Sequence, residues 1–288
     1  MKKDNSLIKF KEFSKSVSII KKLELIDDKN KRCYYTQREL KLFNYFFSEL
    51  QKKQVYTKTK EVKFVTDLMT YNELTGNWYI KDSLKENETI DFILNQKDLK
   101  NILNFNKYNY IKEIENVVSS LGQKTLKITR PYQRTYYFLF NKIDFDKNKD
   151  TGIYTCKVNI NINFLAEILT MNDQQFAKID ITKIKNLKSK YSIRLYEEFE
   201  RILQTSHGHT FKKSIENIKE FFGTKETRQD NLHRYILKSL KELEDNNLFT
   251  CDYKKYKNDE NIWIYSITNI NRIKNDIQIV DEQFEEPF

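Results

Sequence analysis

Residues 186–204 carry a clear helical pattern of apolar and polar positions. At about 100° per residue, the apolar side chains fall on one half of a helical wheel, at Leu187, Tyr191, Leu195, Phe199, Ile202 and Leu203. Charged side chains occupy the other half, at Lys190, Arg194, Glu197, Glu200 and Arg201, although Lys188 and Glu198 intrude on the apolar side. The pattern predicts an amphipathic helix over residues 189–204 that packs one face on a core.

Three helices followed by a hairpin are predicted in the first half of the chain. Thr36 and Glu39 have the spacing of a capping box, which predicts a helix over residues 36–53. Further helices are predicted at 96–104 and 107–121, and Gly122 is suited to cap the latter. Strands are predicted at 62–65, 77–80, 89–94, 125–130, 135–145 and 152–162, the last two forming a hairpin around the polar residues 146–151.

The same order recurs after Ile184. The helix over 189–204 precedes a polar loop at 205–210 and a helix over 214–222 that Gly223 caps; a third helix runs from Asp230, as its N-cap, to about residue 245. Residues 249–254 and 262–268 alternate as a second hairpin would. The spacing of Leu195, Phe199, Leu203 and Gln204 also repeats that of Leu42, Phe46, Leu50 and Gln51.

Three helices and a hairpin, twice over, predict an α+β fold of two tandem winged-helix domains related by internal duplication. We expect a flexible arm at residues 1–32, a first domain at 33–165, a second at 166–270 and an acidic tail at 271–288. A helix around residues 164–169 is expected to join the domains. The tail, which ends in Glu-Glu-Pro-Phe, resembles the acidic tip with which bacterial single-stranded-DNA-binding proteins recruit partners.

Composition narrows the class of partner. The 288 residues carry 51 Lys and Arg against 41 Asp and Glu, a net charge of +10, which favours nucleic acid or an anionic membrane surface, although codon bias of an AT-rich genome explains part of the excess. Neither a signal peptide nor an apolar run long enough to span a membrane is present. Cys33, Cys156 and Cys251 lack the spacing of a zinc site or a disulfide framework, so we expect a cytoplasmic protein.

Signatures of catalysis and of cofactor binding are weak. Five glycines, at 76, 122, 152, 208 and 223, cannot form a phosphate-binding loop. Residues 144–150 imitate the start of a calcium loop, but Lys149 stands where that loop needs glycine. His207 and His209 invite comparison with rolling-circle nickases, yet Gly208 separates them and two imidazoles leave a metal short of ligands. We expect no enzyme activity, metal or cofactor.

The third helix of each half carries the pattern expected of a DNA reader. Leu232, Tyr235, Ile236, Leu240 and Leu243 face inward, and the opposite side bears Asn231, Arg234, Lys238 and Lys241. Arg binds guanine and Asn binds adenine through paired hydrogen bonds, whereas Lys contacts phosphates. Arg228 and Gln229 before this helix, and Lys254, Lys255 and Lys257 on the hairpin, extend the predicted interface. In the first half we expect weaker contacts from Asn109, Lys112, Asn116, Lys124, Arg130 and Arg134. The alternative is a solvated polar face.

Leu187–Glu197, Leu-Lys-Ser-Lys-Tyr-Ser-Ile-Arg-Leu-Tyr-Glu, resembles the signature segment of the plasmid replication initiators (Rep proteins) with two winged-helix domains, and residues 231–243 resemble their recognition helix. The resemblance covers residues 33–270, with a poor match at 54–94. It implies binding of iteron repeats as a monomer, melting of an adjacent AT-rich region, recruitment of the host replicative helicase and initiator proteins, and a homodimer that represses its own promoter. It also implies groove contacts by Arg234 and Lys238.

The sequence therefore predicts a double-stranded-DNA-binding initiator of plasmid replication that opens DNA by binding energy and not by nucleotide hydrolysis. Two alternatives stay open. A winged-helix transcriptional repressor would share the DNA contacts without origin function, and a rolling-circle nickase would cut one strand with a metal ion and a tyrosine.

Overall fold

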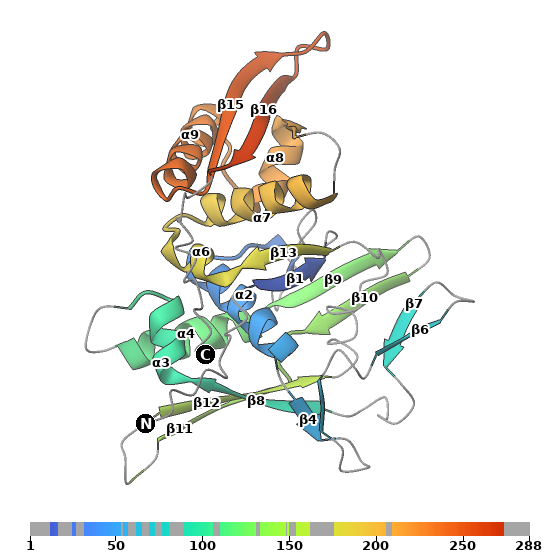
Figure 1. Cartoon of the computed structure of the whole chain (residues 1–288), viewed down its shortest axis with the longest axis vertical. Helices are drawn as coiled ribbons and strands as arrows, with labels where there is room; N and C mark the ends of the chain where they lie inside the picture. The colour runs from blue at the N-terminus through green and yellow to red at the C-terminus, as the bar shows by residue number, and fades with distance from the viewer. Residues whose placement is uncertain are drawn as a thin grey trace, which may run out of the picture.

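The chain folds into two lobes stacked along its long axis (Figure 1). The computed structural model describes residues 12–16, 25–26, 32–52, 54–56, 62–64, 69–72, 77–80, 89–105, 110–130, 133–147, 149, 154–161, 176–205 and 209–273. We call the described residues 25–161 the first lobe and 190–273 the second lobe. Strands β1 (Glu12–Ser16) and β13 (Phe176–Asp180), which pair antiparallel, and helix α6 (Ile181–Asn186) lie where the lobes meet.

The first lobe combines three helices with two main antiparallel sheets. Its helices are α2 (Gln37–Lys52), α3 (Gln96–Ile102) and α4 (Tyr110–Gly122). One sheet has the order β11 (Lys142–Lys147), β12 (Tyr154–Asn161), β8 (Thr89–Asn95); the other has the order β10 (Gln133–Phe138), β9 (Thr125–Arg130), β2 (Leu25–Ile26), β3 (Arg32–Cys33). Two small ribbons pair β4 (Gln54–Tyr56) with β5 (Val62–Phe64) and β6 (Met69–Asn72) with β7 (Asn77–Ile80).

The predicted capping box starts α2 as expected. The Thr36 amide donates to Glu39 Oε2 at 2.6 Å, and the Glu39 amide donates to Thr36 Oγ1 at 3.2 Å, which satisfies two backbone groups that the first turn leaves unpaired. Phe43, Phe46 and Phe47 then project from α2 into a core that α4 and the sheets complete.

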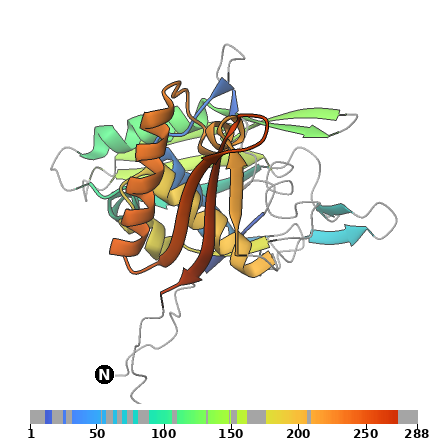
Figure 2. The same cartoon turned by 90° about the horizontal axis from the view of Figure 1, so that it is seen from above.

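The second lobe places three helices against a three-stranded sheet. Its helices are α7 (Lys190–Thr205), α8 (Ile215–Phe222) and α9 (Gln229–Asp245), and its sheet has the order β14 (Phe211–Ser214), β16 (Trp263–Arg272), β15 (Phe249–Lys257). Gly223 ends α8 with φ of 56°, so that its amide and the next one bond to the last carbonyl groups of the helix. Seen from above, α9 and the long β15–β16 hairpin lie side by side (Figure 2).

Helix α7 is buried on all sides along its middle, and this corrects the amphipathic pattern read from the sequence. Every residue from 192 to 200 is buried, including Arg194, Glu197 and Glu200 on the predicted polar half. The reason is that α7 is the part of the second lobe that faces the first lobe, so its polar groups find partners in both lobes. Glu197 accepts hydrogen bonds from Asn44 of α2 at 2.7 Å and from Arg194 at 2.8 Å, and Arg194 Nε donates to the carbonyl of Phe221 in α8 at 3.3 Å.

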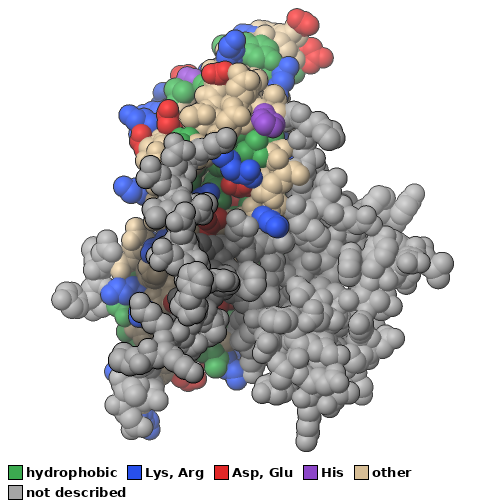
Figure 3. Space-filling model, in the orientation of Figure 1, with side chains coloured by type: hydrophobic (Ala, Val, Ile, Leu, Met, Phe, Trp, Pro, Cys, Tyr) green, Lys and Arg blue, Asp and Glu red, His purple; other side chains and the backbone are tan. Residues whose placement is uncertain are grey.

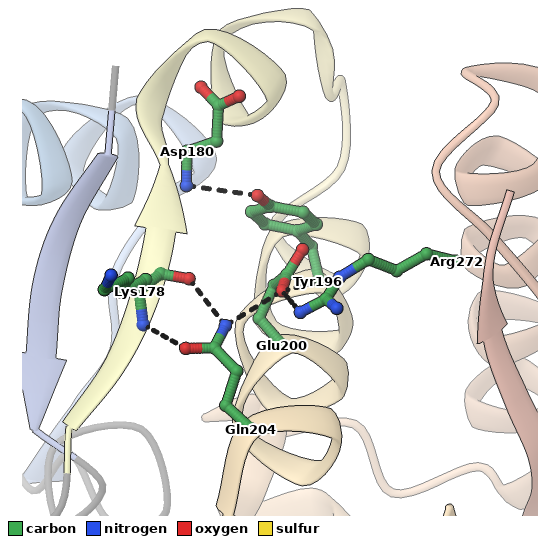
Figure 4. A network of polar contacts seen from close by, with 6 residues as sticks. All are labelled: Lys178, Asp180, Tyr196, Glu200, Gln204 and Arg272. Carbon is green, nitrogen blue, oxygen red and sulfur yellow. Dashed lines mark hydrogen bonds and ion pairs between the residues drawn. The ribbon is translucent and has the colours of Figure 1, made fainter. Parts of the chain in front are cut away.

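A second polar network joins α7 to both β13 and β16 (Figure 4). The side-chain amide of Gln204 bonds to the amide and the carbonyl of Lys178 at 2.7 and 3.0 Å, as a neighbouring strand would. Glu200 pairs with Arg272 of β16 at 2.5 Å, and Tyr196 Oη accepts from the Asp180 amide at 3.1 Å. The lobes are therefore connected by specific hydrogen bonds as well as by apolar packing.

The structure corrects further details of the predicted elements. The strand expected at 135–145 is two strands, β10 and β11, separated by residues 139–141. Asp230 lies inside α9, because Arg228 is its N-cap. Gly122 ends α4 without positive φ; its role is close packing, since a Cβ there would lie 2.6 Å from Ile143 Cδ1.

Other expectations fall on different parts of the chain. Residues 12–16, placed in a flexible arm by the sequence, form β1, and β14 was not predicted. The joining helix around 164–169 and the tail beyond residue 273 lie outside the described residues. Within the part that the structure describes, no helix has the length and apolar character needed to cross a bilayer.

Candidate nucleic-acid interface

Helix α9 is held against the second lobe by one apolar face. Leu232, Ile236 and Leu243 are buried there, and the ring of Tyr235 stacks on Tyr191 of α7 at 4.9 Å with an interplanar angle of 12°. This packing fixes the rotation of the helix, and therefore decides which residues reach solvent.

The opposite face of α9 carries the predicted cationic stripe. Arg234, Lys238 and Lys241 are exposed, as is Arg228 at the N-cap, and Lys and Arg side chains mark this edge of the lobe in Figure 3. Leu237 lies among them with 44% of its surface exposed, which the inward-facing pattern did not single out. An exposed leucine at the centre of a basic face suits contact with a thymine methyl group.

Asn231 and Gln229 behave differently from the exposed cations. Asn231 is partly buried: its Nδ2 donates to Glu226 Oε2 at 3.1 Å, and its Oδ1 accepts from the Arg234 guanidinium at 3.0 Å. Gln229 has a buried amide nitrogen, so this group is directed into the protein. Glu226, which the sequence did not indicate, also accepts from the Arg228 amide at 2.9 Å.

The β15–β16 hairpin forms the wing, and strand register places two of its three predicted lysines on one face. Lys255 and Lys257 stand opposite Tyr265 and Trp263, and their ammonium groups lie 4.5 and 5.3 Å from the centre of a Trp263 ring. Lys254, one position along, projects from the other face. Asp259 and Glu260 at the tip are exposed, so the basic part of the wing lies behind an acidic tip.

A contact between His233 and Tyr253 joins the helix to the wing on the face that carries Lys255. His233 Nδ1 lies 2.7 Å from Tyr253 Oη, and the two rings stack at 5.5 Å. Burial and the nearby Lys255 lower the pKa of His233, while burial raises the pKa of Tyr253, so both groups are neutral at pH 7. This contact therefore fixes α9 against the hairpin that carries Lys255.

The first-lobe candidates are scattered. Lys112 and Asn116 are exposed on α4, and neighbouring Glu113 pairs with Arg38 at 2.8 Å. Arg130 and Arg134 lie on β9 and β10 near the turn of their hairpin, but their side chains, and Asn109 altogether, lie outside the described residues.

Lys124 departs from the prediction of a phosphate contact. Its side chain is 12% exposed and forms an ion pair with buried Glu39, and its ammonium lies 5.5 Å from the Tyr35 ring centre. The buried carboxylate of the α2 capping box needs a cation, and Lys124 supplies it. The ammonium is thus used inside the first lobe.

The described residues offer little for catalysis by a metal. They contain no group of three His, Cys, Asp or Glu side chains arranged to hold an ion. His209 is exposed, and His207 lies outside the described part of the chain.

Comparisons with known proteins agree with this architecture. Residues 78–200 match the family model described as "Initiator Replication protein, WH1". The match extends into α7, past residue 165, where the sequence predicted the first domain to end. No curated protein matches the chain.

Among solved structures, the fold is similar to the crystal structure of Pi initiator protein in complex with iteron DNA. The superposition has a TM-score of 0.51 at 10% sequence identity and covers 86% of this chain and 97% of that one. The predicted α+β fold of two winged-helix domains is confirmed.

Proposed function

We propose that this chain is an initiator replication protein, as the match of residues 78–200 to that family model supports, and that it binds iteron repeats at a plasmid origin through α9 and the wing. The observation that carries the proposal is the contact between His233 and Tyr253, which joins the helix that bears exposed Arg234, Lys238 and Lys241 to the strand that bears Lys255 and Lys257. It lies on the helix and hairpin that winged-helix proteins use for DNA.

The geometry suits duplex DNA. The major groove of B-DNA is about 12 Å wide and admits one α-helix, and one face of α9 is exposed at Arg234, Lys238 and Lys241. Arg234 is near the start of the helix, where base edges are usually met. Lys238 and Lys241 lie farther along, where they would follow the phosphate backbone, and the wing lysines would contact the adjacent backbone.

Several finer features belong to the same proposal. Lys112 and Asn116 of α4, with Arg130 and Arg134, would add phosphate contacts from the first lobe. Binding energy, without nucleotide hydrolysis, would help to melt the origin. The host helicase and initiator proteins as partners, a monomer on iterons, a repressing homodimer and a cytoplasmic location are expected from the family, and none needs a cofactor.

The first experiment measures base preference. Duplexes enriched from a random pool define the preferred site, and affinities for that site and for random DNA are then compared for the wild type and Arg234→Ala. The variant should lose about 1–3 kcal/mol on the preferred site and less on random DNA. Equal losses on both would contradict base reading by Arg234.

Adjacent lysines on β15 provide a matched control for the wing. Lys255→Ala should reduce the slope of log K against log salt by about 0.9, the share of one phosphate. Lys254→Ala removes the same charge from the opposite face and should change the slope much less. Equal slopes for the two variants would show that the wing does not approach DNA by its α9 side.

Origin function separates an initiator from the two alternatives. A plasmid that depends on this protein should fail to replicate with Arg234→Ala. A repressor would leave replication intact while losing control of its promoter. A nickase would relax supercoiled origin DNA with Mg²⁺ and remain covalently attached to it.

A further inference from the structure

We infer that Glu226 and Asn231 are positioning residues that hold the guanidinium of Arg234 for base reading, and that Asn231 does not itself read a base. This inference rests on the proposed function. It reassigns Asn231, whose residue type had suggested contact with adenine.

Both ends of the Asn231 side chain are already engaged. Reading adenine requires the amide oxygen and the amide nitrogen together, but Oδ1 accepts from Arg234 at 3.0 Å and Nδ2 donates to Glu226 at 3.1 Å. Arg234 uses one terminal nitrogen in this contact, and its exposed guanidinium carries further donors for the O6 and N7 atoms of guanine.

The carboxylate at the base of this arrangement is itself fixed. Glu226 Oε1 accepts from the Arg228 amide at 2.9 Å, and the Glu226 amide donates to Thr224 Oγ1 at 3.2 Å. Thr224 Oγ1 lies 3.2 Å from Tyr191 Oη, so the chain of contacts begins on buried helix α7. The Arg228 amide and then the Asn231 amide lower the pKa of Glu226 despite some desolvation, which keeps it an ionised acceptor at neutral pH.

A fixed guanidinium has a defined consequence for recognition. An arginine that is oriented before binding loses less rotamer freedom on the correct base and reaches other bases less easily. Glu226 also places a negative charge near DNA, where it repels phosphates whatever the sequence. Glu226 therefore lowers general affinity while it raises discrimination, and these two effects have opposite signs in a binding experiment.

The test compares affinity for the preferred duplex with affinity for random duplex. Glutamine has one acceptor oxygen where glutamate has two. Glu226→Gln therefore cannot accept from the Arg228 amide and from Asn231 Nδ2 through separate oxygens, as Glu226 does. We expect its affinity for random DNA to rise, and the ratio of preferred to random affinity to fall by about ten-fold, within the range of coupling between contacting polar groups. Asn231→Ala should lower the ratio similarly without raising affinity for random DNA.

Glu244→Gln is the control for the loss of one negative charge without any change at Arg234. Glu244 is an exposed carboxylate farther along α9, so this variant should raise both affinities together and leave the ratio unchanged. Thermal unfolding of each variant verifies that the fold is kept. An unchanged ratio in Glu226→Gln, or a ratio that falls equally in Glu244→Gln, would overturn the positioning role.

A double variant separates this inference from the proposed function. If Glu226 acts through Arg234, adding Glu226→Gln to Arg234→Ala should leave the ratio of Arg234→Ala unchanged, because the group being positioned is absent. A further fall would show that Glu226 acts by another route. If Arg234→Ala alone leaves the ratio at its wild-type value, base reading by Arg234 is refuted. If Arg234→Ala lowers the ratio and Glu226→Gln does not, only the positioning role of Glu226 is refuted.

Discussion

Replacing Arg194 by methionine should destabilise the protein strongly, because it removes the cation that pairs with the buried carboxylate of Glu197. The Arg194 and Glu197 side chains are 6% and 0% exposed, and their ion pair measures 2.8 Å. Methionine has similar length and no charge, so the packing of α7 is largely kept while the charge of Glu197 loses its cation. The loss of stability therefore reports mainly the loss of charge, and much less a change in side-chain volume.

The magnitude follows from what remains around Glu197. Breaking a buried pair on one side costs about 3–5 kcal/mol. Glu197 keeps its hydrogen bond from Asn44 at 2.7 Å, which favours the lower part of that range. Loss of the Arg194 contact with the Phe221 ring, 4.9 Å from the guanidinium carbon, adds about 1 kcal/mol. Against a total stability of about 5–15 kcal/mol for a domain, the variant should unfold at a much lower urea concentration.

Equilibrium urea unfolding followed by circular dichroism and by tryptophan fluorescence measures this change. Arg194→Met combined with Glu197→Gln removes both charges and should be about 2 kcal/mol more stable than the sum of the single effects predicts. A loss below about 1 kcal/mol for Arg194→Met, or simple additivity in the double variant, would refute the view that the two charges depend on each other.

Two further predictions concern other parts of the fold. Gly223→Ala should lower the free energy of unfolding by about 1–2 kcal/mol, because φ is 56° and the new Cβ would lie 2.9 Å from Tyr34 Cδ1; Thr227→Ala, at a nearby exposed position, is the control and should change it little. Burial alone would raise the pKa of Glu39, but hydrogen bonds with Lys124, Ser120 and Thr36 outweigh burial, so the pKa lies below the ordinary 4.5. Its ionised form therefore stabilises the fold above that value, and the contribution disappears as pH falls through the lower folded pKa. Unfolding free energies measured from pH 7 to 3 should fall less steeply below pH 5 in Glu39→Gln; identical profiles would contradict this.

Local patterns in the sequence predicted local structure well. The capping box at Thr36 and Glu39 and the cap at Gly223 depend on residues a few positions apart, and both are present. The inward and outward faces of α9 were also predicted, since a helix packed on one side has a period that its sequence displays.

Structure that depends on distant partners was not predicted. Glu197 is charged and therefore read as solvent-facing, yet its partner Asn44 lies 153 positions earlier. Lys124 was read as a phosphate contact for the same reason, because its pairing with Glu39 is not visible in a periodic pattern. Glu226 was missed because it lies in a turn outside the helical stripe, where spacing gives no signal.

The contacts of buried α7 hold the two lobes in a fixed position relative to each other. In the proposed complex, one added base pair between the segments read by each lobe would displace the second by about 3.4 Å and rotate it by about 34°. Hydrogen bonds from α7 to α2 of the first lobe and to β13, where the lobes meet, resist that adjustment inside the protein. In the proposed complex, the contacts of one interior helix, remote from the DNA, would thus determine the spacing that is allowed within each DNA repeat.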